Sequence, residues 1–184
     1  MRNIHYNLSG IQVFKNRTIS LTLAAAHPLW WTTCLQQAFN RSVFWMSQGP
    51  HWKLPASDLA HAQKMYAKDV NWIEADITQA DLPAQAYDVW HDRAVFHFLT
   101  QAADRQRYID TVRQAVRKGG HVIVATFAPD GPDHCSGLEV VRYSAESLHD
   151  EFGEGFELVD STPETHHIPF GTEQKFIYCY CRKA

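Results

Sequence analysis

The stretch DRQRYIDTVRQAVRKGGHVIVATFAP, residues 104–129, constrains the fold most strongly. Ile109, Val112 and Val116 lie at positions i, i+3 and i+7, so they share one face of a helix. We expect the adjacent glycines that follow Lys118 to end this helix at Gly119-Gly120, because glycine accepts the left-handed backbone of a C-cap. The next segment, HVIVATF, is too apolar to alternate between core and solvent, which is typical of a strand buried on both faces of a parallel sheet.

The flanking segments continue an alternation of strands and helices. VNWIEADIT (70–78) is predicted as a strand with an acidic carboxyl end, and AYDVWHDRAVFHFL (86–99) as a strand that turns at Trp90–Arg93. Ser144 is predicted to cap the helix SAESLHDEF, before FELVDSTPETHH and QKFIYCYC form an antiparallel pair. This order predicts an α/β fold with a mostly parallel sheet and helices on both faces. Ligands of such sheets bind at the carboxyl ends of the strands, where Asp76 lies.

Length and charge limit the class of protein. A chain of 184 residues is expected to form a single domain with a sizeable core, and its net charge of −3 gives no reason to expect nucleic acid or an anionic membrane as a partner. No run of about 18 apolar residues predicts a membrane span, and the first ten residues lack a signal-peptide core. We therefore expect a cytoplasmic protein. The cysteines lack zinc-ligand spacing and predict no metal site: Cys34, Cys135, Cys179 and Cys181.

Acidic residues are absent from the N-terminal third. Residues 1–57 contain five Lys or Arg and no Asp or Glu, so they carry +5 while the remainder carries −8. Residues 30–52 hold four of the six tryptophans, and the segment shows neither helical nor strand periodicity. One interpretation is a basic, aromatic arm for a partner. We expect residues 1–65 to be incomplete or irregular, because without periodic apolar faces they cannot offset their ordering entropy.

Residues 70–184 resemble class I S-adenosylmethionine-dependent methyltransferases, especially a bacterial group of small methyltransferases. The segments that carry the resemblance are WIEADIT, YDVWHDRAVFHFL, VRKGGHVIVATFAPDGPDHCSGL, VVRYSAESL and EQKFIYCYCRK. The pattern D-x-W-H-D-R-A-x-F-H-F-L is the most specific of them. The resemblance implies a Rossmann-like fold with an antiparallel C-terminal strand, S-adenosyl-L-methionine as the cofactor and a small-molecule methyl acceptor. It makes residues 1–184 one domain, with 1–65 anomalous.

The resemblance also implies a set of cofactor-binding residues. Asp76 would accept a hydrogen bond from the adenine amino group, and Ile77 would pack on the adenine ring. The turn formed by His91, Asp92 and Arg93 would lie beside the methionine part of the cofactor and the transferred methyl. His91 is the candidate catalytic residue, as a base or as a group that orients the substrate.

Each of these residues also has a purely structural interpretation. Asp76 could cap the turn that follows it, His91 could hydrogen-bond backbone at the strand end, and Asp92 and Arg93 could form an ion pair. His97 lies in an apolar run and is predicted to be a packed histidine with its hydrogen bonds satisfied. The adjacent histidines His166-His167 would point to opposite faces of a strand, which argues against a paired metal site.

The family pattern also requires a glycine-rich loop after the first strand and an acid at the end of the second, and residues 1–57 contain neither. A shifted frame supplies both. If each codon takes the last base of one residue's codon and the first two of the next, Trp31-Thr32 must give Asp, and Phe44-Trp45-Met46 must give Leu-Asp. The other positions permit I-L-D-V-G-G-G-A-S-T-L-V-D-x-L-L from ISLTLAAAHPLWWTTCL, and V-L-D-V-T-G-A-A-L-E-A from SVFWMSQGPHWKL.

A shifted frame is one of several explanations for residues 1–57. Chance agreement in a divergent arm is another, and the origin of a true shift could be a sequencing error, a pseudogene or a compensated double indel. At the level of function, the first hypothesis is a methyltransferase with impaired cofactor binding. The alternative is a degenerate, non-catalytic binding protein that contacts a partner through Trp30, Trp31, Trp45 and Trp52. A nucleotide-dependent Rossmann-like enzyme is disfavoured because neither frame contains a phosphate loop.

Overall fold

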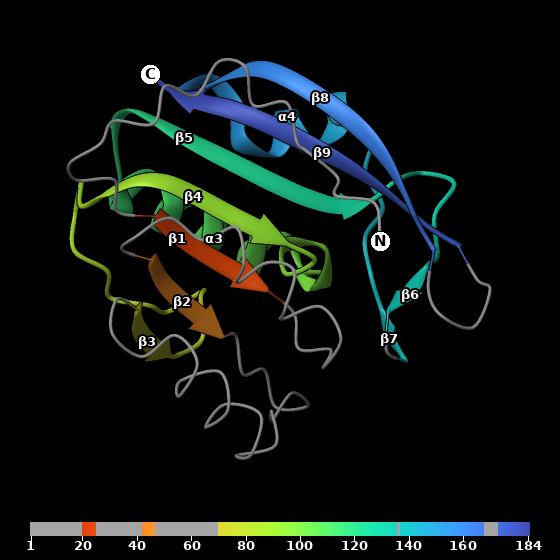
Figure 1. Ribbon diagram of the computed structural model, residues 1–184, viewed down its shortest axis with the longest axis horizontal. Coiled ribbons are helices and arrows are strands. Elements are labelled where there is room, and N and C mark those ends of the chain that lie inside the picture. The colour runs from red at the N-terminus through yellow and green to blue at the C-terminus, as the bar shows by residue number, and fades with distance from the viewer. Residues whose placement is uncertain (1–19, 25–41, 47–69, 136, 168–172) are drawn as a thin grey trace.

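The computed structural model describes residues 20–24, 42–46, 70–135, 137–167 and 173–184. Its central feature is a seven-stranded sheet with the order β3-β2-β1-β4-β5-β9-β8 (Figure 1). The five strands β1 to β5 run parallel, and β9 runs antiparallel to β5 and β8. This is the predicted mostly parallel sheet with an antiparallel C-terminal strand. The strands are β1 (Ser20–Ala24), β2 (Ser42–Met46), β3 (Val70–Glu74), β4 (Tyr87–Arg93), β5 (Val116–Phe127), β8 (Phe156–His167) and β9 (Glu173–Lys183).

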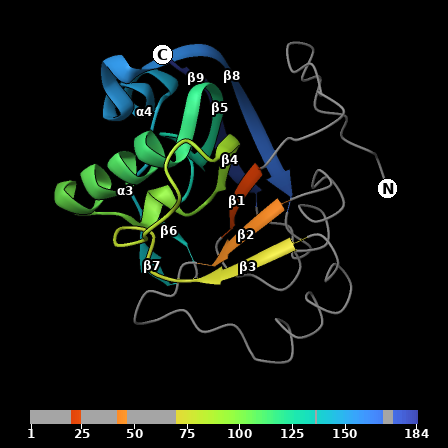
Figure 2. The ribbon, with the colours of Figure 1, turned by 90° about the vertical axis from the view of Figure 1, so that its left-hand side faces the viewer.

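The described helices α3 (Ala102–Ala115) and α4 (Ala145–Phe152) lie on the same side of the sheet (Figure 2). They enclose the main core, where Tyr108 and Val112 of α3 and Leu148 of α4 are fully buried. The core includes strand residues such as Trp90 and Val122. Among the described helices, none combines the length and apolar character needed to cross a membrane.

Three short elements complete the described fold. The 3-10 helix η1 (Phe96–Phe98) follows β4, and η2 (Gly153–Gly155) follows α4. Between β5 and α4, the strands β6 (His134–Cys135) and β7 (Leu138–Glu139) pair as a small antiparallel hairpin. Figure 1 places this hairpin beyond the carboxyl end of β5.

The helix α3 ends earlier than predicted. The expected C-cap at Gly119-Gly120 is wrong, because the helix stops at Ala115 and Val116 already has an extended backbone. Val116 pairs with Tyr87 of β4, so sheet pairing begins four residues before Gly120. Gly119 still uses its conformational freedom, with φ of +70° inside β5 rather than at a helix end.

The turn predicted at Trp90–Arg93 is also displaced. All four residues belong to β4, which continues to Arg93, and the chain leaves the sheet at Ala94, where φ is 62°. By contrast, the predicted cap of α4 is confirmed: the Ser144 side chain accepts a hydrogen bond from the Ser147 backbone N–H, and the Ser147 side chain completes a capping box.

Two segments within residues 1–65 are described, and both are strands. β1 pairs with β2 and β4, and β2 pairs with β3, at the positions where the family places its first two strands. The range is therefore not irregular throughout. The predicted glycine-loop region after β1, and the region around Trp30, Trp31 and Trp52, lie outside the described residues.

Candidate functional site at the carboxyl edge of the sheet

The sequence predicts that Asp76 and His91 lie near each other at the carboxyl edge of the sheet; they share that edge, but two strands separate them. Asp76 follows the carboxyl end of β3, and His91 lies near the carboxyl end of β4. Because β3 and β4 run in the same direction with β2 and β1 between them, their carboxyl ends share one edge. A ligand that contacts both residues would therefore extend across the ends of two intervening strands.

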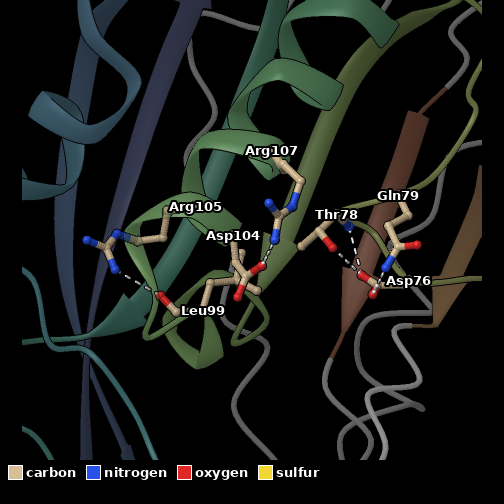
Figure 3. A network of polar contacts seen from close by, with 7 residues as sticks. All are labelled: Asp76, Thr78, Gln79, Leu99, Asp104, Arg105 and Arg107. Atoms are coloured by element: carbon tan, nitrogen blue, oxygen red, sulfur yellow. Dashed lines mark hydrogen bonds and ion pairs between the residues drawn. The ribbon is translucent and has the colours of Figure 1, made fainter.

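The Asp76 carboxylate is engaged in the turn that follows β3. Its Oδ1 accepts hydrogen bonds from the Thr78 backbone N–H at 2.9 Å and the Thr78 hydroxyl at 2.8 Å, and its Oδ2 accepts from Gln79 Nε2 at 3.1 Å. Figure 3 shows both side chains turned toward Asp76, away from the separate contacts of Arg105 and Arg107. This is the turn-capping arrangement predicted as the structural alternative. Because Asp76 is exposed, its carboxylate remains open to solvent.

Ile77 belongs to the main core. Its side chain is 1% exposed and packs within the cluster that includes Tyr108 and Ile109 of α3. Ile77 thus anchors the Asp76 turn on the helix side of the sheet. An adenine ring would have to meet it at the core boundary, where little of its surface is accessible.

His91 lies in the middle of the sheet, paired with Thr22 of β1 and Ile123 of β5. Burial, and secondarily the positive charge of Arg93, lowers the pKa of His91 to about 4. The imidazole is therefore neutral at physiological pH. A neutral imidazole can accept a hydrogen bond, which suits the role of orienting a substrate, whereas a pKa this low makes His91 a weak general base at neutral pH.

Asp92 faces the opposite side of the sheet from His91 and is fully buried. Its Oδ1 accepts a hydrogen bond from the Val95 N–H at 2.9 Å, and its Oδ2 accepts from the Phe96 N–H at 3.0 Å and the Tyr108 hydroxyl at 2.5 Å. Both oxygens are thus engaged within the protein. This arrangement fixes the turn from β4 into η1 and leaves the carboxylate pointing away from the face that His91 occupies.

Tyr108 connects this turn to the main core. It accepts a hydrogen bond from Trp90 Nε1 at 2.9 Å while it donates to Asp92. Burial raises the pKa of Asp92 to about 7, although the three hydrogen bonds that it accepts act in the opposite direction. The sequence prediction did not identify Tyr108. Its only signal was a polar aromatic residue on the apolar face of the 102–115 helix.

Arg93 does not form the ion pair that was considered with Asp92, because the two side chains project from opposite faces of β4. Its Nη2 lies 3.3 Å from Oε1 of Glu164 on β8, with both side chains half-buried. The guanidinium also lies over the rings of Phe176, at 5.2 Å, and Tyr178, at 6.0 Å. Arg93 therefore ties the end of β4 to the C-terminal strands across β5.

The remaining histidines follow their structural interpretations. His97 in η1 is fully buried, as predicted, and its ring packs between Phe98 and Phe127 with centroid distances of 4.5 and 4.8 Å. The prediction that its hydrogen bonds are satisfied is wrong for the described residues, because neither ring nitrogen has a partner among them. On β8, His166 is half-buried while His167 is exposed, consistent with opposite faces of the strand. His167 Nδ1 lies 3.3 Å from Oε1 of Glu173, its register partner at the start of β9.

Comparisons with known proteins agree on the fold and on the type of domain. A family model described as a methyltransferase domain matches residues 45–124. The N-methyltransferase NodS from Bradyrhizobium japonicum has a TM-score of 0.66 at 14% identity, with 90% of this chain and 85% of NodS covered. A SAM-dependent methyltransferase from Methanosarcina mazei has a TM-score of 0.65 at 9% identity, with 92% and 94% covered.

A further solved structure shows NodS in complex with S-adenosyl-L-homocysteine, the demethylated cofactor. It matches this chain with a TM-score of 0.65 at 13% identity and covers 90% of this chain and 78% of NodS. Among curated proteins, no sequence matches. The strand order and the antiparallel β9 agree with the methyltransferase domain that the family model identifies. Residues 45–124 therefore match a methyltransferase domain, and the chain has the fold of S-adenosylmethionine-dependent methyltransferases.

Proposed function

We propose that this protein retains the scaffold of a small-molecule methyltransferase but binds S-adenosylmethionine far more weakly than an intact member of its family. The observation that carries the proposal combines the fold with the sequence. The strands β1 and β2 occupy the positions where the family holds the cofactor, yet the first acidic residue of the chain is Asp58. The residues that follow β1 begin with two alanines, where the family has a glycine-rich loop.

The described residues fit part of the cofactor. Asp76 is exposed at the end of β3 and could exchange its Gln79 contact for the adenine amino group, because a carboxylate oxygen accepts more than one hydrogen bond. Asp92 fits less well, since all its hydrogen bonds are internal and its side chain is fully buried. A ribose-binding carboxylate at the end of β2 is absent from the sequence. The site therefore supports adenine contact without the ribose contact.

The chemistry of the cofactor explains why this loss matters. A sulfonium methyl is already activated, so methyl transfer depends mainly on alignment of the acceptor, the methyl group and the sulfur. The neutral His91 would orient an acceptor at the end of β4. Without the loop amides and the ribose carboxylate, alignment would be lost together with affinity, and each charged hydrogen bond removed costs about 1.5–3 kcal/mol.

The methyl acceptor is proposed to be a small molecule. The net charge of −3 does not favour a nucleic-acid substrate, whose phosphates require a basic surface. The half-buried face of β4, β5 and β9 carries aromatic side chains instead, including Phe176 and Tyr178. Aromatic walls of this kind are typical of small-molecule sites.

The experiment compares Asp76 variants in the frame-restored protein, in which the shifted reading replaces residues 18–65. We expect this protein to bind S-adenosylhomocysteine, and Asp76→Asn to weaken binding by about 10- to 100-fold, since it loses one charged hydrogen bond. Asp81→Asn is the matched control, because Asp81 is exposed in the same loop. Equal affinities for Asp76→Asn and the unsubstituted protein would show that Asp76 serves only its own turn.

A further inference from the structure

A group of basic side chains lies at the edge of the sheet opposite the candidate cofactor site. The strand β5 begins at this edge and β9 ends there, because the two strands run antiparallel (Figure 1). His121 of β5 and Arg182 of β9 are register partners, and Arg117 lies at the start of β5. We call Arg117, His121 and Arg182 the basic edge group. The glycine pair within this stretch of β5 does not serve the helix end that the sequence predicted.

Two guanidinium groups converge beside Gly119, whose φ is +70°. A Cβ at Gly119 would lie 3.7 Å from Arg182 Nη2 and 3.9 Å from Arg117 Nη1, so these two nitrogens are at most about 7.6 Å apart. Arg182 is exposed and Arg117 is half-buried, so both are accessible to a ligand from solvent. Like charges this close repel each other, and a bound anion would turn the repulsion into attraction.

The neighbouring carboxylates do not neutralise both arginines. Asp88 Oδ1 accepts a hydrogen bond from Arg117 Nε, which orients that guanidinium, and Arg117 Nη1 donates to the Lys118 carbonyl at 3.1 Å. Glu157 of β8 is the register partner of Arg182 on its other side. Even so, within the described part of the chain Arg182 has neither an ion pair nor a hydrogen bond. Its N–H donors therefore remain available to a ligand.

His121 senses the charge of the two arginines. Its Nδ1 lies 2.6 Å from the Tyr180 hydroxyl, which holds the ring in place. Burial, followed by the positive charges of Arg182 and Arg117, lowers the pKa of His121, while Asp88 acts in the opposite direction. An anion bound between the two guanidiniums would offset their charges and raise this pKa. The histidine is thus a built-in reporter of anion binding.

We propose that Arg117 and Arg182 bind the phosphate group of a small anionic ligand at this edge of the sheet. Guanidinium groups match phosphate oxygens in geometry, with charge-assisted hydrogen bonds of about 2.7–2.9 Å. A phosphate that accepts such bonds on two of its oxygens spans the gap between the arginines. Its two negative charges compensate both cations, whereas a carboxylate compensates one. The site is independent of the proposed function, because the cofactor would bind at the opposite edge.

The test follows the ring resonances of His121 by NMR in the full chain without cofactor. Inorganic phosphate is the probe, acetate is the singly charged comparison, and sodium chloride keeps the ionic strength constant. We expect saturable phosphate binding that raises the pKa of His121, and acetate to bind more weakly by about tenfold. Glycerol 3-phosphate distinguishes the two sources of the phosphate group: tighter binding than phosphate assigns an ester as the ligand, and equal or weaker binding assigns free phosphate.

Two arginine variants separate a specific site from general attraction. Arg182→Gln should weaken phosphate binding by about tenfold, the worth of one charge-assisted hydrogen bond at an exposed position. Arg107→Gln is the matched control, because it removes the same charge from an exposed position on α3. It should leave the affinity unchanged.

Three results would overturn the proposal. The pKa of His121 could stay constant as phosphate is added, or it could rise without saturation, which would indicate an adventitious ion only. Equal losses of affinity in Arg182→Gln and Arg107→Gln would indicate attraction to net charge rather than a site. If Arg182→Gln does not fold, the His121 titration of the unsubstituted chain decides the matter alone.

Discussion

The Tyr108 hydroxyl should contribute more to stability than any other single polar atom discussed above. Replacing Tyr108 with Phe keeps the ring contacts with Trp90 and Phe96, whose centroids lie 5.7 and 5.0 Å away. It removes the acceptor of the Trp90 N–H and one donor to Asp92, both in a fully buried setting. The change therefore isolates two hydrogen bonds without opening a large cavity.

The expected cost follows from the two groups left behind. An unsatisfied Trp90 N–H costs about 1–3 kcal/mol, and a hydrogen bond to a charged Asp92 is worth about 1.5–3 kcal/mol. The two effects share one hydroxyl and are not additive, so we expect a total near 3 kcal/mol. For a chain of this size that corresponds to a fall in melting temperature of about 6–12 °C. Urea unfolding followed by circular dichroism measures the free energy.

The loss should also grow with pH. The pKa of Asp92 is raised in the folded state from 3.8 to about 7, so the stability that it contributes is present below pH 3.8 and is lost as pH rises through 7. Removing the Tyr108 donor raises this pKa further, because that hydrogen bond favours the charged form. The penalty of Tyr108→Phe should therefore be larger at pH 8 than at pH 6.

Tyr143→Phe is the matched control. Its hydroxyl donates to Glu151 across a longer distance of 3.4 Å in a half-buried position, so its loss should cost less than about 1 kcal/mol. Equal losses for the two variants, or a Tyr108→Phe penalty that does not change between pH 6 and 8, would refute the reasoning about the buried Asp92 network.

Three further predictions concern stability. The pKa values of His91 and His97 are lowered to about 4 and 3, so the stability that they contribute is present above pH 6.5 and is lost as pH falls. In urea unfolding, His97→Phe should reduce the pH dependence of the unfolding free energy between pH 6 and 4 by about 1.4 kcal/mol per pH unit. Ser144→Ala should cost about 1 kcal/mol by removing the cap of α4, and a change confined to experimental error would contradict the capping box. Gly120→Ala should lower the melting temperature by several degrees, because the new Cβ would lie 2.6 Å from Val116 Cγ1. Overpacking of this kind costs roughly 1–3 kcal/mol. An unchanged melting temperature would show that this contact relaxes freely.

Much of the fold from residue 70 onward could be predicted because its signals are local. Ser144 and Ser147 are three residues apart, and their capping box needs no distant partner. The end of α3 could not be predicted in this way. The glycine pair is a strong local stop signal, but Val116 pairs with Tyr87, 29 residues earlier in the chain, and this pairing takes precedence.

The candidate site was harder to predict than the fold. The family resemblance implies that Asp92 contacts the cofactor, because it places the His91–Arg93 turn beside the methionine part. Its role depends on Tyr108, whose position over β4 is set by the packing of α3 rather than by any motif. The side chain of Asp76 is described equally well by its turn contacts and by the family role, since both use the same carboxylate. Sequence spacing identifies which residues reach an edge, whereas register and packing decide where they point.

The most direct test of the account is isothermal titration of S-adenosylmethionine into the chain with its present sequence and into the frame-restored variant. Loss of two or three charged hydrogen bonds, each worth about 1.5–3 kcal/mol, would weaken a micromolar site by at least about 100-fold, and beyond millimolar once the loss exceeds about 4 kcal/mol. We therefore expect no measurable heat from the present chain and micromolar binding by the restored one. Micromolar binding by the present chain would contradict the account, because residues 1–57 would then hold the cofactor without a single carboxylate.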